Sequence, residues 1–184
     1  MNQLRAKALR ARREMDEHER ATASELICKR VIHSGLFFAS RSIACYLPME
    51  DEVDTRGIIE AAWRANKRIF VPVLRERGKM LFRELSHKTL LEQNSFGIWE
   101  PVDGELISPR NLDIAITPTV AFDRNNNRIG MGGGYFDRCF AYLRHRQRWF
   151  RPKLIGVAFT CQAVEKIRPN PWDIRLYTVF SDAD

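Results

Sequence analysis

Residues 112–138 decide the fold, and they read LDIAITPTVAFDRNNNRIGMGGGYFDR. The first part, Leu112–Thr117, has no charge after Asp113 and predicts a buried β-strand. The last part, residues 128–138, contains four of the ten glycines in the chain. A strand that leads through a glycine loop into a helix is typical of an α/β protein. Apolar residues at helical spacing mark the expected helix, namely Tyr135, Cys139, Tyr142 and Leu143.

The glycine loop has the composition of an anion-binding site. Consecutive glycine amides can turn toward one point, and the N-terminus of a following helix adds the positive end of its dipole. Arg128 and Arg138 place a positive charge at either end of the loop. Such a loop favours a phosphate group. A tight turn that only reverses the chain is the alternative.

Two known phosphate-binding motifs are excluded. The chain has no G-x-x-x-x-G-K-[ST] sequence, so the loop is not a P-loop. Gly130 and Gly132 could begin a dinucleotide-binding fingerprint, but Tyr135 occupies the position of its third glycine. No acidic residue lies between Asp137 and Glu165, so the carboxylate that would bind a ribose is absent as well.

Helices and strands are expected to alternate along the rest of the chain. Asp16 and Glu19 form a capping-box pattern, which marks the start of the second helix. The alternation predicts a mostly parallel sheet with helices on both faces. Ligands bind at the carboxyl ends of such strands, so the segments after Leu47, Thr117 and Phe159 are expected to share one site. The expected helices span residues 4–15, 16–33 and 54 or 55 to 63, and the expected strands span residues 42–47, 68–74, 80–85, 112–117, 153–159 and 177–180, with a hairpin turn at residues 76–79.

Composition narrows the class of protein. The chain has 184 residues, and 45% of them are hydrophobic, which suffices for one buried core. No apolar run reaches the length of a membrane span, and the N-terminus lacks the apolar core of a signal peptide, so a cytoplasmic protein is expected. The cysteines form no C-x-x-C pair and the histidines are scattered, so a zinc site is not expected.

The formal net charge of +7 indicates an anionic partner. Residues 1–13 hold five Lys or Arg and residues 138–153 hold six, and neither segment contains an acid. An RNA-binding module is therefore an alternative to a site for a nucleotide or another polyanionic small molecule. Against it, the chain has no aromatic RNP pattern, and Asp137 follows the glycine loop.

Several segments, in the same order, resemble the 5-formyltetrahydrofolate cyclo-ligase (5,10-methenyltetrahydrofolate synthetase) family. The resemblance extends along nearly the whole chain, and the strand with its glycine loop is the most specific part. It implies a single-domain three-layer α/β/α Rossmann-like fold over residues 1–184, with a mostly parallel sheet and an N-terminal helical segment at about residues 2–34. The matching segments are residues 4–5, 46–55, 96–101, 113–123, 127–134 and 170–173.

The resemblance also implies an activity. Such an enzyme converts 5-formyltetrahydrofolate to 5,10-methenyltetrahydrofolate with ATP and magnesium, and it releases ADP and phosphate after passing through a phosphorylated formyl intermediate. Folate and ATP are then the small-molecule partners, a monomer is expected, and neither a membrane nor a nucleic acid is required. A family member that acts on another folate or pterin is the alternative within this class.

Residue by residue, the resemblance assigns the nucleotide and the metal. Arg128, Tyr135 and Asp137 are the catalytic candidates. Asp137 and Asp173 are the candidate magnesium ligands, because an acid beside a phosphate site needs a cation between them. Asp123 is a weaker candidate, and a surface turn is the alternative role of Asp173. The implied ATP-binding residues are Arg5, Arg128, Ile129, Gly130, Met131, Gly132, Gly133, Gly134, Tyr135 and Phe136.

A second group of residues is assigned to the folate. An ionised Glu52 can accept hydrogen bonds from the ring nitrogen and amino group of a pterin. Apolar and aromatic side chains would supply the stacking surface. For Leu47 and Trp99, packing in the core is the alternative. The implied folate-binding residues are Leu47, Met49, Glu52, Trp99 and Tyr135.

One position departs from the family pattern. The family usually has a lysine four residues before the arginine that matches Arg5, whereas this chain has Met1 there. The contact of that lysine is therefore either absent or supplied by Lys7 or the amino terminus.

Overall fold

The computed structural model describes residues 1–75, 78–95, 97–144 and 150–183. A seven-stranded sheet lies at its centre, in the order β11-β10-β7-β1-β2-β3-β6. The strands from β11 to β2 are parallel, whereas β3 and β6 pair antiparallel at one edge, so the prediction of a mostly parallel sheet is confirmed. The strands are β1 (Ser42–Ala44), β2 (Arg68–Arg75), β3 (Lys79–Leu85), β6 (Leu106–Ile107), β7 (Ile114–Pro118), β10 (Lys153–Val157) and β11 (Thr178–Phe180).

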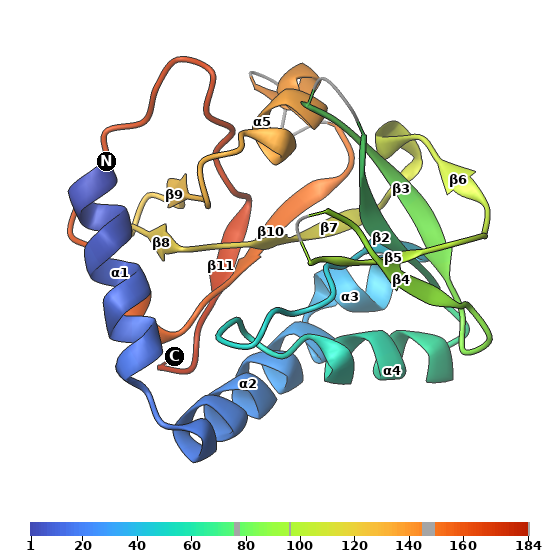
Figure 1. The fold of residues 1–184 in the computed structure, drawn as a ribbon, viewed down its shortest axis with the longest axis horizontal. Coiled ribbons are helices and arrows are strands. Elements are labelled where there is room, and N and C mark those ends of the chain that lie inside the picture. Colours follow the sequence, from blue (N-terminus) through green and yellow to red (C-terminus); the bar gives the residue numbers. More distant parts are fainter. Residues whose placement is uncertain (76–77, 96, 145–149, 184) are drawn as a thin grey trace.

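Helices cover both faces of the sheet, as Figure 1 shows. Successive side chains of a strand point to opposite faces. Accordingly, Ile69 of β2 belongs to the buried cluster under α2, α3 and α4, whereas Phe70 belongs to the cluster that contains Phe140 and Leu143. The result is the expected three-layer arrangement. The helices of the two outer layers are α2 (Glu17–Ile32), α3 (Gly35–Ala39) and α4 (Arg56–Arg64) on one face, and α5 (Tyr135–Cys139) with the 3-10 helix η3 (Ala141–Leu143) on the other.

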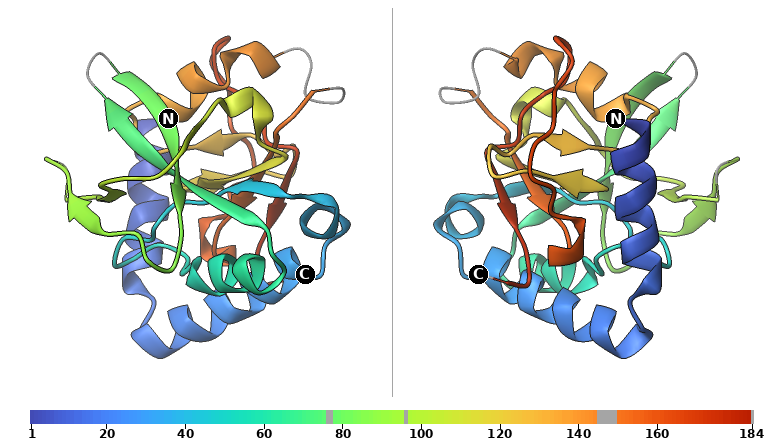
Figure 2. Two further views of the ribbon diagram at one scale, coloured as in Figure 1. Left: turned by 90° about the vertical axis from the view of Figure 1, so that its right-hand side faces the viewer. Right: turned by 90° about the vertical axis from the view of Figure 1, so that its left-hand side faces the viewer.

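The first helix, α1 (Asn2–Glu14), lies outside these layers. It packs against a hairpin of β8 (Ala121–Phe122) and β9 (Arg128–Ile129), and Ala8 shares a small separate cluster with residues of that hairpin. Figure 2 shows α1 descending along one side of the molecule to its junction with α2. The remaining elements are the hairpin of β4 (Leu91–Gln93) and β5 (Trp99–Pro101) and the 3-10 helices η2 (Pro109–Asn111) and η4 (Thr160–Gln162).

The sequence correctly predicted the cap of α2, but the expected side-chain cap of α4 is not formed. The capping box of α2 is confirmed, because Asp16 accepts from the Glu19 amide and the Glu19 carboxylate accepts from the Asp16 amide. Thr55 precedes α4 as expected, but its hydroxyl donates to the carbonyl of Tyr46 at 2.7 Å and does not cap the helix. That hydrogen bond instead closes the loop between β1 and α4.

Three other elements differ in length from their predictions. β1 ends at Ala44 and β10 at Val157, so both strands stop before the segments expected to bind ligand. The helix after the glycine loop spans only five residues, because the backbone of Phe140 leaves the α region (φ −101°, ψ 16°). Residues 76–77 of the predicted hairpin turn lie outside the described residues. None of the helices in the described ranges is long and apolar enough to cross a membrane.

Candidate active site

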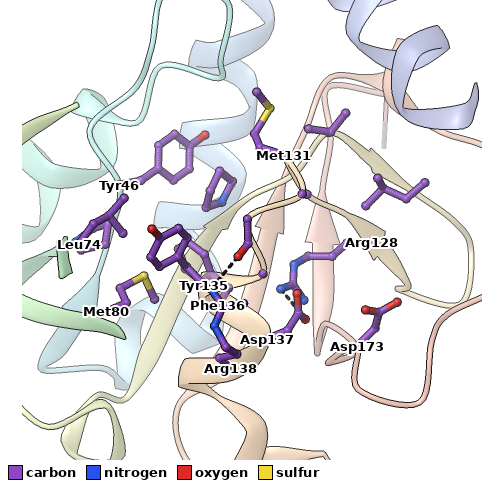
Figure 3. A pocket seen from close by; sticks show the side chains of 18 of the residues that line it. Tyr46, Leu74, Met80, Arg128, Met131, Tyr135, Phe136, Asp137, Arg138 and Asp173 are labelled. Atoms are coloured by element: carbon purple, nitrogen blue, oxygen red, sulfur yellow. Dashed lines mark hydrogen bonds and ion pairs between the residues drawn. The ribbon is translucent and has the colours of Figure 1, made fainter. Parts of the chain in front are cut away.

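A cavity of about 600 Å³ lies beyond the carboxyl ends of the parallel strands (Figure 3). Leu47 after β1, Pro118 at the end of β7 and Asp173 in the segment after β10 all line it. Its size is that of a site for one or two small molecules. Apart from Asp123, the weaker metal candidate, every residue predicted to bind ATP, folate or magnesium lines this cavity, although Arg5 and Asp173 stand near opposite ends of the chain.

The glycine loop forms one wall of the cavity, and two of its residues need glycine for conformational reasons. Gly132 has φ 106° and Gly134 has φ 64°, in the region that residues with a Cβ rarely adopt. Arg5 of α1 donates from Nε to the carbonyl of Gly130 at 2.9 Å and so ties the N-terminal helix to the loop. Because α5 has only five residues, most of the attraction for an anion at this loop would come from the loop amides and not from a long helix dipole.

Arg128 and Asp137 form a shielded ion pair in this wall. Arg128 Nη2 donates to Asp137 Oδ1 at 2.9 Å, and the two side chains are 5% and 24% exposed. The amide of Ile174 donates to the same oxygen at 2.9 Å, and Arg128 Nη1 donates to the carbonyl of Ile174. The pair therefore fixes Asp137 against the segment that carries Asp173, and Figure 3 shows both carboxylates on the same side of the cavity as Arg128.

The two carboxylates fit a hard divalent cation. Asp137 accepts its hydrogen bonds from the protein through Oδ1. Asp173 accepts through Oδ2, from the amide of Asn170 at 2.8 Å. The other oxygen of each carboxylate accepts no hydrogen bond within the described part of the chain. No cluster of three His, Cys, Asp or Glu occurs among the described residues. Magnesium is suited to such a site, because it binds through one or two carboxylates, substrate phosphates and water.

Asp123, the weaker metal candidate, has a structural role. It is buried and does not line the cavity. Its carboxylate accepts from the amides of Asn125, Asn127 and Ile167 and from the side chain of Asn127, and together these contacts lower its pKa even though burial opposes ionisation. Asp123 thus holds the turn between β8 and β9, and the suggestion that it binds a metal is wrong.

The loop between β1 and α4 brings Glu52 to the cavity. Glu52 Oε2 accepts from the amide of Met49 at 3.1 Å. Burial raises the pKa of Glu52, while the Met49 hydrogen bond and the charge of Arg12 oppose that rise. Met49 and Trp99 are each 48% exposed, so Trp99 does not have the core position given as its alternative. Leu47 is only partly buried and packs against the main core cluster while also lining the cavity.

The structure adds cavity residues that were not assigned to a ligand from the sequence. Arg138 donates to the carbonyl of Gly133 at 2.7 Å and to that of Gly78 at 3.2 Å, so it ties the glycine loop to the hairpin of β2 and β3. Its place after Asp137 was visible in the sequence, but the contact with Gly78 was not. Other added residues are Tyr46, Leu74, Met80, Arg144, Asn170 and Trp172. Of the two proposed substitutes for the missing lysine, the residue Met1 lines the cavity and Lys7 does not.

Comparisons with known proteins agree with this architecture. A model of the 5-formyltetrahydrofolate cyclo-ligase family matches residues 1–182. The 5-formyltetrahydrofolate cyclo-ligase of Haemophilus influenzae is 38% identical over 144 residues, covering 76% of this chain and 75% of that protein. The Mus musculus protein of the same name is 28% identical over 185 residues, covering 94% and 89%.

Solved structures give the same result. The NMR structure of Aquifex aeolicus 5,10-methenyltetrahydrofolate synthetase has a TM-score of 0.85 and 28% identity, covering 100% of this chain and 90% of that one. A Mycoplasma pneumoniae 5,10-methenyltetrahydrofolate synthetase has a TM-score of 0.76 at 23% identity, covering 98% of each chain, and shows that the fold is shared.

Proposed function

Because the chain belongs to the 5-formyltetrahydrofolate cyclo-ligase family and is an enzyme of folate metabolism, we propose that it uses ATP and magnesium to convert 5-formyltetrahydrofolate to 5,10-methenyltetrahydrofolate. The observation that carries the proposal is a single cavity lined by the glycine loop, by Glu52 and by two carboxylates, each with one oxygen that accepts no hydrogen bond from the described residues. A phosphate group, a cation and a pterin would thereby meet at one place.

In the proposed reaction the folate itself supplies both nucleophiles. Its formyl oxygen attacks the γ-phosphorus of ATP and ADP leaves. Nitrogen 10 of the folate then attacks the formyl carbon and loses its proton, the ring closes, and phosphate leaves. No protein nucleophile is needed. In agreement, the buried thiols of Cys28 and Cys45 do not line the cavity, and burial raises their pKa values to about 11 and about 12.

The protein would then act by positioning and by charge. We assign the triphosphate to the loop amides of Gly130–Gly134 and to Arg5, and the cation to Asp137 and Asp173. When bound, magnesium would neutralise charge on the phosphate oxygens. Arg128 would orient Asp137 through their ion pair and add positive charge near the transferred phosphoryl group, where stabilisation is electrostatic. Tyr135, Met49 and Trp99 would contact the folate rings.

The near-ultraviolet absorbance of the methenyl product tests the proposal directly. The protein, ATP, magnesium and 5-formyltetrahydrofolate are mixed, and absorbance is expected to rise only when all four are present. Product analysis should give ADP and phosphate in equal amounts with the methenyl compound. Turnover of another reduced folate, with none of 5-formyltetrahydrofolate, would instead favour a different substrate for the same site.

Replacing Glu52 by Gln is expected to weaken folate binding by roughly tenfold to a hundredfold, since one charge-assisted hydrogen bond contributes about 1.5–3 kcal/mol. Gln retains the acceptor for the Met49 amide, so the loop should keep its shape. Calorimetry should show unchanged binding of ATP. Glu50→Gln is the matched control, because Glu50 is exposed in the same loop and lies outside the main cavity. Equal weakening of both ligands would contradict a direct role for Glu52.

Replacing Gly130 by Ala should raise the KM for ATP by about tenfold, an effect of about 1.4 kcal/mol. A Cβ at Gly130 meets no other atom within 4 Å and needs no unusual φ, so the folded protein should tolerate it. Bound phosphate would meet that methyl group. Gly133 is less suitable for this test, because its Cβ would press on the Tyr135 ring at 3.0 Å.

Gly35→Ala is the matched control for the Gly130 variant. Gly35 also has open space around its Cβ position, but it lies in α3, away from the cavity. Both variants should melt within a few degrees of the unmodified protein, and only Gly130→Ala should change the dependence on ATP. An unchanged KM for ATP in that variant would mean that phosphate does not lie against Gly130.

A further inference from the structure

Arg12 of α1 is a buried cation outside the residues assigned to either substrate. It is 3% exposed, and two nitrogens of its guanidinium each pair with a different oxygen of the Asp51 carboxylate. The Nη2–Oδ1 distance is 3.0 Å and the Nε–Oδ2 distance is 3.2 Å. Two-point pairs of this kind fix geometry as well as charge. Removing one partner of a shielded pair leaves the other charge without compensation, which is strongly unfavourable.

Arg12 shares one face of α1 with the residue that holds the glycine loop. Arg5, Ala8 and Arg12 are spaced by three and four positions and therefore lie along one side of the helix. Arg5 contacts the carbonyl of Gly130, and Ala8 belongs to the cluster with the β8–β9 hairpin. In Figure 1 the loop that follows β1 extends toward the other end of the same helix. One turn of α1 thus contacts the glycine loop, where the nucleotide is proposed to bind. Another turn contacts the loop between β1 and α4, called the folate loop below because it carries Glu52.

The contact with Asp51 adds a second anchor to the folate loop. At the far end, the hydroxyl of Tyr46 donates to the carbonyl of Val53, and the hydroxyl of Thr55 donates to the carbonyl of Tyr46. Asp51 lies between this anchored end and the tip of the loop, directly before Glu52. The Arg12–Asp51 pair therefore restrains the part of the loop from which Glu52 reaches the cavity.

We propose that Arg12 is a positioning residue for the folate: through Asp51 it holds Glu52 at the cavity, and through α1 it fixes the folate loop relative to the glycine loop. This inference rests on the proposed function and adds a residue to it. Arg12 touches neither substrate in this scheme. Its loss should therefore change how the folate is bound and leave the nucleotide site intact.

The test compares Arg12→Gln with Arg13→Gln. Arg13 is the matched control, because it stands next on the same helix and approaches the same carboxylate at 3.6 Å but is 70% exposed. Arg12→Gln is expected to raise the KM for 5-formyltetrahydrofolate by about tenfold or more, with the KM for ATP and kcat within about twofold of the unmodified values. Arg13→Gln should change none of them appreciably, since exposed pairs contribute little.

The pH dependence gives a readout that a general loss of structure would not produce. The positive charge of Arg12 favours the ionised form of Glu52. Without it, the rise in folate KM toward low pH should begin at a higher pH, because the pKa of Glu52 increases further. A second pocket, beside α2, also has Glu52 in its lining. The other titratable and charged groups near Glu52 are Tyr46 and Asp51 and, in that second pocket, Glu17, Arg20, Glu50, Asp54 and Arg56.

Two further variants separate a poorly folded protein from a misplaced loop. Asp51→Asn should raise the folate KM as Arg12→Gln does, and the double variant should be no worse than either single one, since both remove the same contact. Arg12→Lys should recover part of the loss. If the control forms methenyl product and Arg12→Gln behaves like it, or if the double variant shows additive effects, the positioning role is wrong. If even the unmodified protein forms no product, the proposed function itself fails.

Discussion

Replacement of Asp137 by Asn is expected to reduce turnover on the order of a hundredfold or more, the usual effect of removing one electrostatic contact to a transition state. Asn has the same shape, and its remaining oxygen can accept from Arg128 and from the amide of Ile174 as Oδ1 does now. What the substitution removes is the negative charge and the second oxygen, which has no partner among the described residues. The expected loss therefore concerns the bound cation and its phosphates.

Folate binding measured without nucleotide serves as the control for the Asp137 variant. It should stay near the unmodified value, because the hydrogen bonds and the ion pair of Asp137 among the described residues join it to Arg128 and Ile174 and not to Glu52 or its loop. The melting temperature should fall, because the substitution leaves the charge of the shielded Arg128 without its partner charge, although the remaining oxygen can still accept a hydrogen bond from Arg128. Turnover at the unmodified rate would mean that Asp137 only holds Arg128 and the segment after β10 in place.

Removal of divalent cations is expected to stop product formation completely. Two carboxylates form a weak site by themselves, and phosphate oxygens would have to complete it. EDTA should therefore abolish turnover, and added magnesium should restore it. EDTA in the absence of ATP should leave the melting temperature unchanged, because the fold does not depend on the ion. Full product formation in EDTA would contradict the assignment of Asp137 and Asp173 as metal ligands.

Local sequence signals predicted much of the fold and of the cavity. The capping box of α2 and the apolar strand that leads into the glycine loop depend on neighbouring residues, so they are visible without a structure. The resemblance of the chain to one family then identified Glu52 and Asp173, among many acidic residues, as the candidates for binding folate and metal. The loop conformation explains why glycine occurs at Gly132 and Gly134, but only the structure shows that Arg5 contacts the same loop.

What the sequence did not predict depends on contacts between distant segments. Arg12 reads as part of a basic helix, and only its pairing with Asp51, 39 positions away, shows that it is buried. Asp123 reads as an acid near a phosphate loop, and its four hydrogen bonds reveal a structural role. The shortness of α5 was missed because apolar periodicity continues through Tyr142 and Leu143 while the backbone turns at Phe140.

The separate docking of α1 has a consequence for amide hydrogen exchange. Apart from the Arg12–Asp51 pair, its buried contacts belong to a small apolar cluster around Ala8, distinct from the two clusters that hold the sheet and the other helices. Segments with few buried contacts open locally at a free energy well below that of global unfolding. The amides of α1 should thus exchange faster than those of β7 and β10 and slow down when both substrates are bound. Local opening of α1 would then expose the glycine loop while the sheet stays folded.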